Sequence, residues 1–343
     1  MKTDQPFQEY LRHYLRSLDF IKKSIIAIAA LAAAGSTLAQ SNVTLYGRAD
    51  IGIGSVKEAG KSTSKMIDNN LTTSRWGMRG TEDLGGGLKA SFKFEQRLNL
   101  STGEVQSPAF KGETSVGLSG GFGAVTMGRF TTVFDDVRAL SNSNSVFDSN
   151  SFTPAIAGVY GSGGDYSSRF GSQIRYDLPA MGGFYGAIGY AFESATDKDD
   201  GMTALKLGYK TKELNVALGL QNEKGSDNDY AALSASYSFG AAALSGGFNS
   251  RKGNDAKGDD TEYTLGVNVP MGAFDFSVGY AASETEVGGS TTQKANGLGL
   301  GATYKMSKRT RAYAGLSKVD FKNGAGTKTG DKRIFALGLR HDF

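Results

Sequence analysis

The chain has 343 residues, with 48 Gly, 5 Pro, 2 His, one Trp and no Cys, and its formal charge is +4. Glycine is about twice as frequent as usual, but glycine and proline together stay below the level typical of disordered chains. The lack of cysteine excludes disulfides, thiolate catalysis and cysteine-based metal sites. Lys and Arg are scattered rather than gathered in a stripe, so nucleic-acid binding is not expected.

Residues 1–39 read as an N-terminal extension followed by a secretory signal peptide. A pair of lysines precedes an apolar core at 25–34, and small residues follow it. Because this core is too short to cross ~30 Å of hydrocarbon as a helix, a membrane anchor is disfavoured. We expect cleavage after Ala39, which leaves 40–343 as one exported domain.

From residue 42 onward the chain repeats a period of two residues. In "LNVALGLQ", for example, Leu214, Val216, Leu218 and Leu220 share one face. Short turns and long polar connections alternate between such segments. Counting them predicts sixteen strands, the first near 43–54 and the second near 71–80, with a long polar loop between them over residues 57–70.

Two all-β architectures compete for this pattern. A soluble sandwich or propeller also has many short strands, but its connections do not sort into short and long ones. Strands of ~9–11 residues, even in number, are typical of outer-membrane barrels. The last segment, "RIFALGLRHDF", has one apolar face and ends at Phe343, and edge groups in lipid must be paired. The sequence therefore predicts a 16-stranded antiparallel transmembrane β-barrel, closed by pairing of the last strand with the first.

Alternation also separates lipid-facing from lumen-facing side chains. Apolar residues such as Trp76, Phe92 and Phe170 are assigned to lipid, since a charge there costs ~2–4 kcal/mol at mid-membrane. The charged residues assigned to the lumen are Arg48, Asp50, Arg75, Arg79, Lys89, Lys93, Glu95, Arg97, Lys111, Glu113, Arg169, Arg175 and Asp177. Bases outnumber acids in this set, which predicts an anion preference. The alternative is a generic solvated lumen, with charges wherever lipid is absent.

Arg129 does not fit strict alternation. Val125 and Met127 are assigned to lipid, and the same parity would send Arg129 outward. A register break at Gly128 would turn it into the lumen. The sequence does not decide between the two.

The segment 131–167 is far longer than an ordinary loop, so it is expected to be functional. Its aromatic content favours packing inside the barrel over a disordered tether. Asp135, Asp136 and Asp148 are its candidate acids. Opposite a row of arginines they would set a transverse field at the narrowest point of the pore. The equally open alternative is that Asp135 and Asp136 cap a short helix beginning near Val137.

Four motifs together resemble the trimeric general porins of Gram-negative outer membranes, in the branch typical of β-proteobacteria. They are "SNVTLYGRADIGI", "SRWGMRGTEDLGGGLKASFKFE", "FGAVTMGRF" and the closing "FALGLRHDF". The resemblance implies a homotrimer surrounded by outer-membrane lipid and lipopolysaccharide. It also implies passive diffusion of small hydrophilic solutes and ions.

The same resemblance implies roles for particular segments. The third external loop folds into the barrel, loop 99–109 latches onto a neighbouring subunit, and Phe343 is a signal for the outer-membrane assembly machinery. The residues that match the basic wall of the family's pore constriction are Arg48, Arg75, Arg129 and Arg169.

Other functions are less compatible with the sequence. A catalytic triad needs a base such as histidine, but His13 lies in the N-terminal extension and His341 near the C-terminus, and no nucleophile matches either. No enzyme, cofactor or metal site is therefore expected. A substrate-specific outer-membrane channel is the stronger alternative, although such channels usually have an aromatic slide and here the expected lumen residues are charged or small. A structural barrel that conducts no ions is a further alternative.

Overall fold

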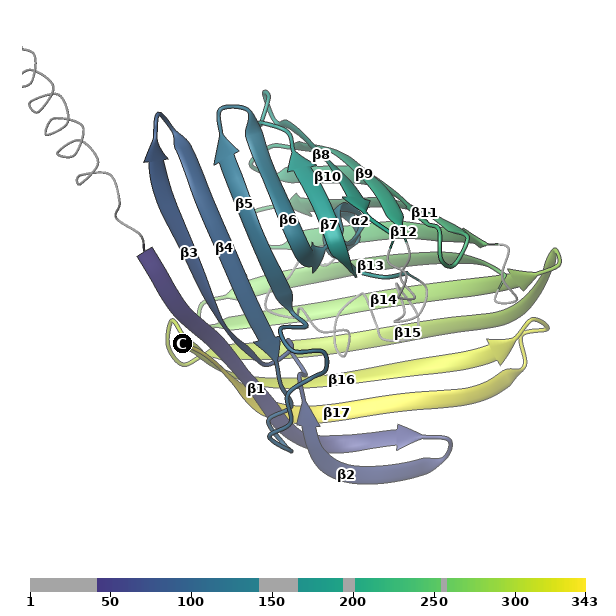
Figure 1. Cartoon of the computed structure of the whole chain (residues 1–343). Helices are drawn as coiled ribbons and strands as arrows, with labels where there is room; N and C mark the ends of the chain where they lie inside the picture. The colour runs from purple at the N-terminus through teal and green to yellow at the C-terminus, as the bar shows by residue number, and fades with distance from the viewer. Residues whose placement is uncertain (1–41, 142–165, 194–200, 254–257) are drawn as a thin grey trace, which may run out of the picture.

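The computed structural model describes residues 42–141, 166–193, 201–253 and 258–343. These residues form one antiparallel sheet of seventeen strand segments, with a single helix (Figure 1). No helix within these four ranges is long and apolar enough to cross a membrane. The elements are β1 (Asn42–Glu58), β2 (Lys61–Asp68), β3 (Arg75–Gly85), β4 (Leu88–Arg97), β5 (Glu113–Gly120), β6 (Gly123–Thr131), α2 (Val133–Ala139), β7 (Arg169–Asp177), β8 (Phe184–Ala191), β9 (Met202–Lys210), β10 (Leu214–Glu223), β11 (Asn228–Ser238), β12 (Ala243–Gly253), β13 (Asp259–Met271), β14 (Phe274–Val287), β15 (Ser290–Lys305), β16 (Thr310–Asn323) and β17 (Lys328–Asp342).

The sheet closes into a barrel because β17 pairs with β1. β2 and β3 together occupy one position in it: residues 42–48 of β1 pair with β3, and residues 51–58 pair with β2. Seventeen segments therefore fill sixteen positions. This confirms the predicted 16-stranded antiparallel barrel.

The prediction of a long polar loop over residues 57–70 is wrong. β1 continues to Glu58 and turns back as β2, through Ala59 and Gly60 with φ of 49° and 79°. Positive φ at both central residues is what a tight two-residue hairpin requires. The interruption in pairing lies instead at residues 69–74, and the second barrel position resumes at Arg75 rather than near residue 71.

The C-terminal residue completes the closure. Phe343 donates its N–H to the carbonyl oxygen of Gly47 (3.0 Å) and accepts the N–H of Gly47 (2.9 Å). A Cβ at Gly47 would overlap the Phe343 ring, so glycine provides the space for the ring. The last and first strands thus leave no open edge at this end, as lipid requires.

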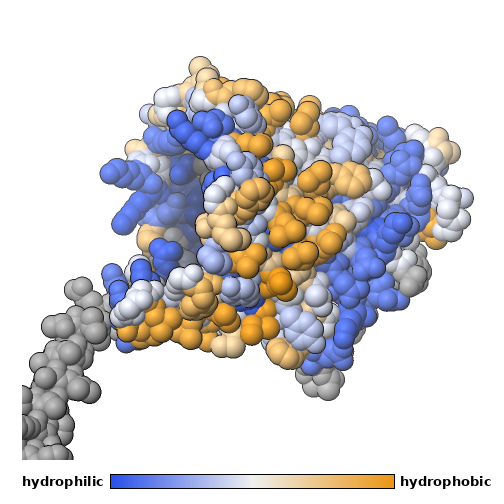
Figure 2. All heavy atoms as spheres, turned by 90° about the horizontal axis from the view of Figure 1, so that it is seen from above, coloured by the Kyte–Doolittle hydropathy of each residue, from blue (hydrophilic) through white to orange (hydrophobic). Residues whose placement is uncertain are grey.

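The two faces of the wall differ in polarity. Large apolar side chains such as Phe184, Leu207, Leu265 and Phe335 are exposed on the outer face. In Figure 2 hydrophobic side chains gather in a band that lies between regions of hydrophilic ones. An exposed apolar band of this kind is the surface that a lipid bilayer covers.

Helix α2 packs against the inner face of the wall. Its Val133 clusters with Ala187, Ala191 and other buried residues of β8 and β9, whose exposed apolar neighbours point the opposite way. Phe134 and Val137 cluster with buried residues of β10 and β11. Figure 1 shows the helix inside the curve of the sheet.

The helix begins earlier than the capping alternative assumed. Thr132 is its N-cap and accepts the N–H of Asp135 with its hydroxyl, so the helix starts at Val133 and not near Val137. Asp135 and Asp136 lie in its first turn. Residues 142–165, with Asp148, lie outside the described residues, so inward folding of the whole loop stays a prediction.

Candidate functional site

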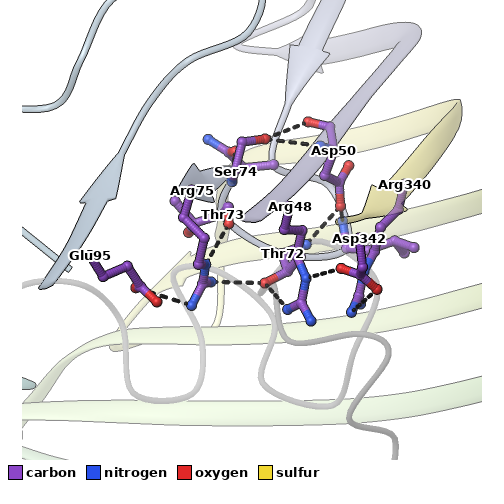
Figure 3. Close-up of polar contacts among 11 residues, drawn as sticks. Arg48, Asp50, Thr72, Thr73, Ser74, Arg75, Glu95, Arg340 and Asp342 are labelled. Carbon is purple, nitrogen blue, oxygen red and sulfur yellow. Dashed lines mark hydrogen bonds and ion pairs between the residues drawn. The ribbon is translucent and has the colours of Figure 1, made fainter. Parts of the chain in front are cut away.

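Two of the predicted lumen arginines meet inside the barrel. Arg48 of β1 lies directly opposite Arg75 of β3 in the strand register. The hydroxyl oxygen of Thr72 accepts hydrogen bonds from both, at 3.4 Å from Arg48 Nη1 and 3.0 Å from Arg75 Nη2. Arg75 also donates from Nε to the carbonyl oxygen of Thr73 (2.9 Å). Figure 3 shows the two guanidinium groups on either side of Thr72.

Each arginine also has a carboxylate partner. Arg48 Nε lies 2.5 Å from Asp342 Oδ1, and Arg340 Nη2 lies 3.2 Å from the other oxygen of the same carboxylate. Arg75 Nη1 lies 3.4 Å from Glu95 Oε1. Carboxylates therefore compensate part of the positive charge of the arginines on this wall.

The turn that presents Thr72 is fastened to β1 by Asp50. The Asp50 carboxylate accepts the N–H groups of Leu71 (2.8 Å) and Thr72 (2.9 Å), and Asp50 N–H donates to the hydroxyl of Ser74 (2.9 Å). Asp50, Thr72 and Ser74 are fully buried. Asp50, predicted as a lumen acid, thus holds the backbone of the turn instead of facing the channel.

A second group of charges surrounds Glu95 on the same wall. Glu95 accepts the hydroxyl of Tyr46 (3.0 Å), and Lys93 bridges Glu95 (3.8 Å) and Glu113 (2.7 Å). The Arg79 guanidinium lies over the Tyr46 ring, 5.1 Å from its centre, which is a cation–π arrangement. These predicted lumen residues therefore form one network with Arg75.

The remaining predicted bases lie at other points of the wall. Arg97 is opposite Arg75 in the register of β3 and β4, and Lys89 is opposite Asp83 toward the other end of the same strands. The predicted register break in β6 is present, because pairing with β7 shifts between Gly128 and Phe130 and Gly128 has φ of 132°. The inward direction of Arg129 that this break allows remains a prediction.

The β7 strand corrects one assignment of faces. Phe170, expected to face lipid, is buried and clusters with Val133 of α2 on the inner face. The irregular Ser172, with φ of 49°, interrupts the alternation on which the assignment depended. Arg169, the residue before Phe170, donates from Nε to the carbonyl oxygen of Gly112 (2.9 Å). The N–H of Gly112 in turn donates to the carbonyl oxygen of Glu95 (3.0 Å).

Asp136 of α2 is paired with the wall on which the helix rests. Its carboxylate lies 2.7 Å from Arg175 Nη2 and 2.8 Å from Lys206 Nζ. Arg175 also pairs with Asp177 (2.7 Å). The charge of Asp136 is therefore compensated by bases of β7 and β9, and the expected transverse field across the pore stays a prediction.

Asp135 takes part in a contact that joins the beginning and the end of the long segment 131–167. Tyr166 donates its hydroxyl to Asp135 (2.7 Å), and Arg138 contacts both residues. The Tyr166 ring packs edge-on against Phe134 at 5.1 Å between ring centres. Burial, together with the neighbouring charge of Asp135, raises the pKa of Tyr166 well above its usual value.

Several of these contacts were missed by the sequence reasoning. The signal for them is the same alternation, which places Arg340 and Asp342 on the inner face of the last strand and Lys206 on the inner face of β9. The run Asp68-Asn69-Asn70 is typical of a turn, and Asn69 has φ of 62°, but no pattern in the sequence assigns Thr72 to the arginines. Within the described ranges, no three His, Asp or Glu side chains gather in an arrangement that could hold a metal ion.

Comparison with known proteins adds to this geometry. A family model described as Gram-negative porin matches residues 26–324. Outer membrane porin protein 32 of Delftia acidovorans is 34% identical over 93% of this chain and 95% of its own length. The solved structure of an anion-selective porin from Comamonas acidovorans has 28% identity and a TM-score of 0.74, covering 89% of this chain and 100% of that one.

A more distant structure agrees in fold alone. OmpT of Vibrio cholerae, solved in a trimer form, has 18% identity and a TM-score of 0.67, covering 88% of this chain and 99% of that one. Further matching porins come from Bordetella pertussis and Neisseria meningitidis, which confirms the predicted resemblance to the β-proteobacterial branch. The closed barrel, its apolar outer face and its charged lining all agree with these matches. The chain belongs to the Gram-negative porin family, and it is a multi-pass outer-membrane porin, a passive channel and not an enzyme.

Proposed function

We propose that this porin is a water-filled channel for small hydrophilic solutes and ions that prefers anions. The observation that carries the proposal is the meeting of Arg48 and Arg75 at Thr72 on the inner wall. Fixed bases on a pore lining raise the local concentration of anions and lower that of cations. The anion selectivity named for the Comamonas acidovorans porin supports the same direction.

The preference is moderate, because acids stand beside the bases. Arg48 shares Asp342 with Arg340, and Arg75 shares Glu95 with Lys93. The side chains of Arg48 and Arg75 keep 28% and 17% of their surface exposed, so they remain accessible to solutes. Arg129 and Arg169 complete the basic wall in this proposal, and the further bases of the lining are Arg79, Lys89, Lys93, Arg97 and Arg175.

The assembly proposals concern partners of the whole barrel. The chain forms a homotrimer in outer-membrane lipid and lipopolysaccharide, and the trimer form of the Vibrio cholerae OmpT structure supports this. A signal peptide is removed after Ala39 during export. Phe343, at the strand that closes the barrel, is the signal read by the assembly machinery.

Planar-bilayer recording of the purified protein tests the proposal. Insertion of a trimer gives conductance steps with three closing levels, and a gradient of KCl gives a zero-current potential of the sign set by chloride. A potential of the sign set by potassium would contradict the anion preference. Small saturable currents blocked by one solute would indicate a substrate-specific channel instead.

A further inference from the structure

The turn at residues 69–74 is unlike the other described connections, because it interrupts a barrel strand within the wall. Asn70, Leu71, Thr72 and Ser74 are all fully buried. A break in a strand removes ladder hydrogen bonds, and the backbone groups that it frees must find partners elsewhere. The partners found here are the carboxylate and carbonyl of Asp50 in β1, the side chain of Asn69 within the turn, and the N–H of Leu98. Two side chains of other strands, Asp50 and Tyr313, anchor the turn.

The first anchor is Asp50 of β1, which accepts two N–H groups of the turn. The second is Tyr313 of β16, which reaches the turn from the other side of β17 and β1. Its hydroxyl donates to Asp50 Oδ1 (2.9 Å) and accepts from Asn70 Nδ2 (2.9 Å). Tyr313 also packs against Leu71 and Ala336, and a Cβ at Gly338 would overlap its hydroxyl. The wall is therefore shaped to bring this one hydroxyl to the turn.

The residues that Asp50 anchors also contact the arginines. Thr72 offers its hydroxyl to Arg48 and Arg75, and Thr73 offers its carbonyl to Arg75. These acceptors compete with the carboxylates of Asp342 and Glu95 for the same guanidinium groups (Figure 3). Removing the Thr72 hydroxyl takes one acceptor away from both arginines and shifts each guanidinium toward its carboxylate, and closer ion pairing reduces the positive potential that it gives to the lumen.

We propose that Tyr313 is a positioning residue of the channel: it fixes the turn at 69–74 through Asp50 and Asn70, and the turn holds Arg48 and Arg75 where they act on permeating ions. This inference rests on the proposed anion preference. It assigns to the turn a role in selectivity as well as in wall structure.

Tyr313→Phe tests it without changing any formal charge of the lining. We expect the anion-to-cation permeability ratio, obtained from the zero-current potential in a KCl gradient, to fall about twofold. Thr72→Val should shift the ratio in the same direction, and Thr72→Ser, which keeps the hydroxyl, should restore it. Tyr304→Phe is the matched control, since its ring is exposed on the outer face and packs at a tilt against Phe274.

The double variant Tyr313→Phe/Thr72→Val supplies a second criterion. Because both changes act on one chain of contacts, the shift in the double variant should be smaller than the two single shifts combined. An anion-selective wild type whose ratio is kept by both Tyr313→Phe and Thr72→Val would overturn the inference. A wild type without anion preference would instead refute the proposed function. Should Tyr313→Phe fail to fold, the contrast between Thr72→Val and Thr72→Ser decides.

Discussion

Phe343 and Gly47 exchange both of their backbone hydrogen bonds, at 3.0 and 2.9 Å, and the Phe343 ring occupies the space that a side chain at Gly47 would take. The final residue of the chain and the first strand therefore fit each other at the seam of the barrel. This relationship ties the last strand to the first by both backbone pairing and side-chain packing.

Replacing Gly47 by alanine should weaken the seam. The added Cβ meets the Phe343 ring and forces the last strand away from the first, so we expect the free energy of unfolding to fall by about 1–3 kcal/mol. Urea unfolding in lipid vesicles, followed by tryptophan fluorescence, measures this change. Gly171→Ala is the control, because a Cβ at Gly171 meets open space. Equal stability of the two variants would show that the packing of the Phe343 ring does not depend on the absence of a side chain at Gly47.

Glu95→Gln should strengthen the anion preference. Glu95 is buried and lies near both Arg75 (3.4 Å) and Lys93 (3.8 Å), so its negative charge compensates two bases of the lining. Glutamine keeps the shape and an acceptor for Tyr46 but removes the charge. We expect the anion-to-cation permeability ratio to rise by about twofold, measured from zero-current potentials. Glu213→Gln, at an exposed turn, makes the same change of charge away from the lining and should leave the ratio as it is.

Asp136→Asn should loosen helix α2 from the wall. The substitution leaves Arg175 and Lys206 without the carboxylate that both contact, at 2.7 and 2.8 Å. Breaking a fully buried ion pair costs ~3–5 kcal/mol, and because Asp136 is 32% exposed we expect a smaller loss of about 1–3 kcal/mol in the free energy of unfolding.

In single-channel recordings, Asp136→Asn should close more often than the wild type, because the helix is held less firmly to the wall. Asp177→Asn is the matched control, since it removes a partner of the same Arg175 while the helix contact stays. Identical closing frequencies in the two variants would contradict a role of Asp136 in docking the helix.

Alkaline pH should destabilise the contact of Tyr166 with Asp135. Burial and the charge of Asp135 raise the pKa of Tyr166, and Arg138 and Tyr230 also lie against it. Below about pH 10 the hydroxyl is protonated in the folded and the unfolded chain, so its stabilising contribution is complete. As the pH rises further the unfolded chain loses this proton first, and the free energy of unfolding falls by about 1.4 kcal/mol per pH unit.

The comparison variant for this prediction is Tyr166→Phe, which lacks the titrating group. Urea unfolding between about pH 9 and pH 11 should show a steeper decline for the wild type than for the variant. Parallel declines would mean that Tyr166 ionises as easily in the folded barrel as in the unfolded chain.

The barrel itself was predictable from local pattern. Its signals are properties of short segments: a period of two residues, short turns that alternate with long polar connections, and an apolar last strand. Each depends on contact with lipid or water rather than on a particular partner. The same holds for the charges of the lining: Arg48, Arg75, Lys93 and Glu95 were placed by parity alone and meet in one network.

The parts that could not be predicted depend on partners distant in sequence. The turn at 69–74 exists because Asp50 and Tyr313, 263 residues apart, both reach it. Phe170 turns inward because α2 offers it an apolar surface, and Asp136 faces β7 and β9 because the helix rests there. Alternation fails where the wall contacts something other than lipid or water, which is where the pore is shaped.

The zero-current potential of the wild type and of Arg48→Gln/Arg75→Gln in the same KCl gradient shows whether these two arginines set the anion preference. We expect an anion-preferring wild type and a double variant in which most of that preference is lost, because both fixed charges at Thr72 are gone. An unchanged potential in the double variant, with the channel still open, would show that these two arginines do not set the selectivity of the pore.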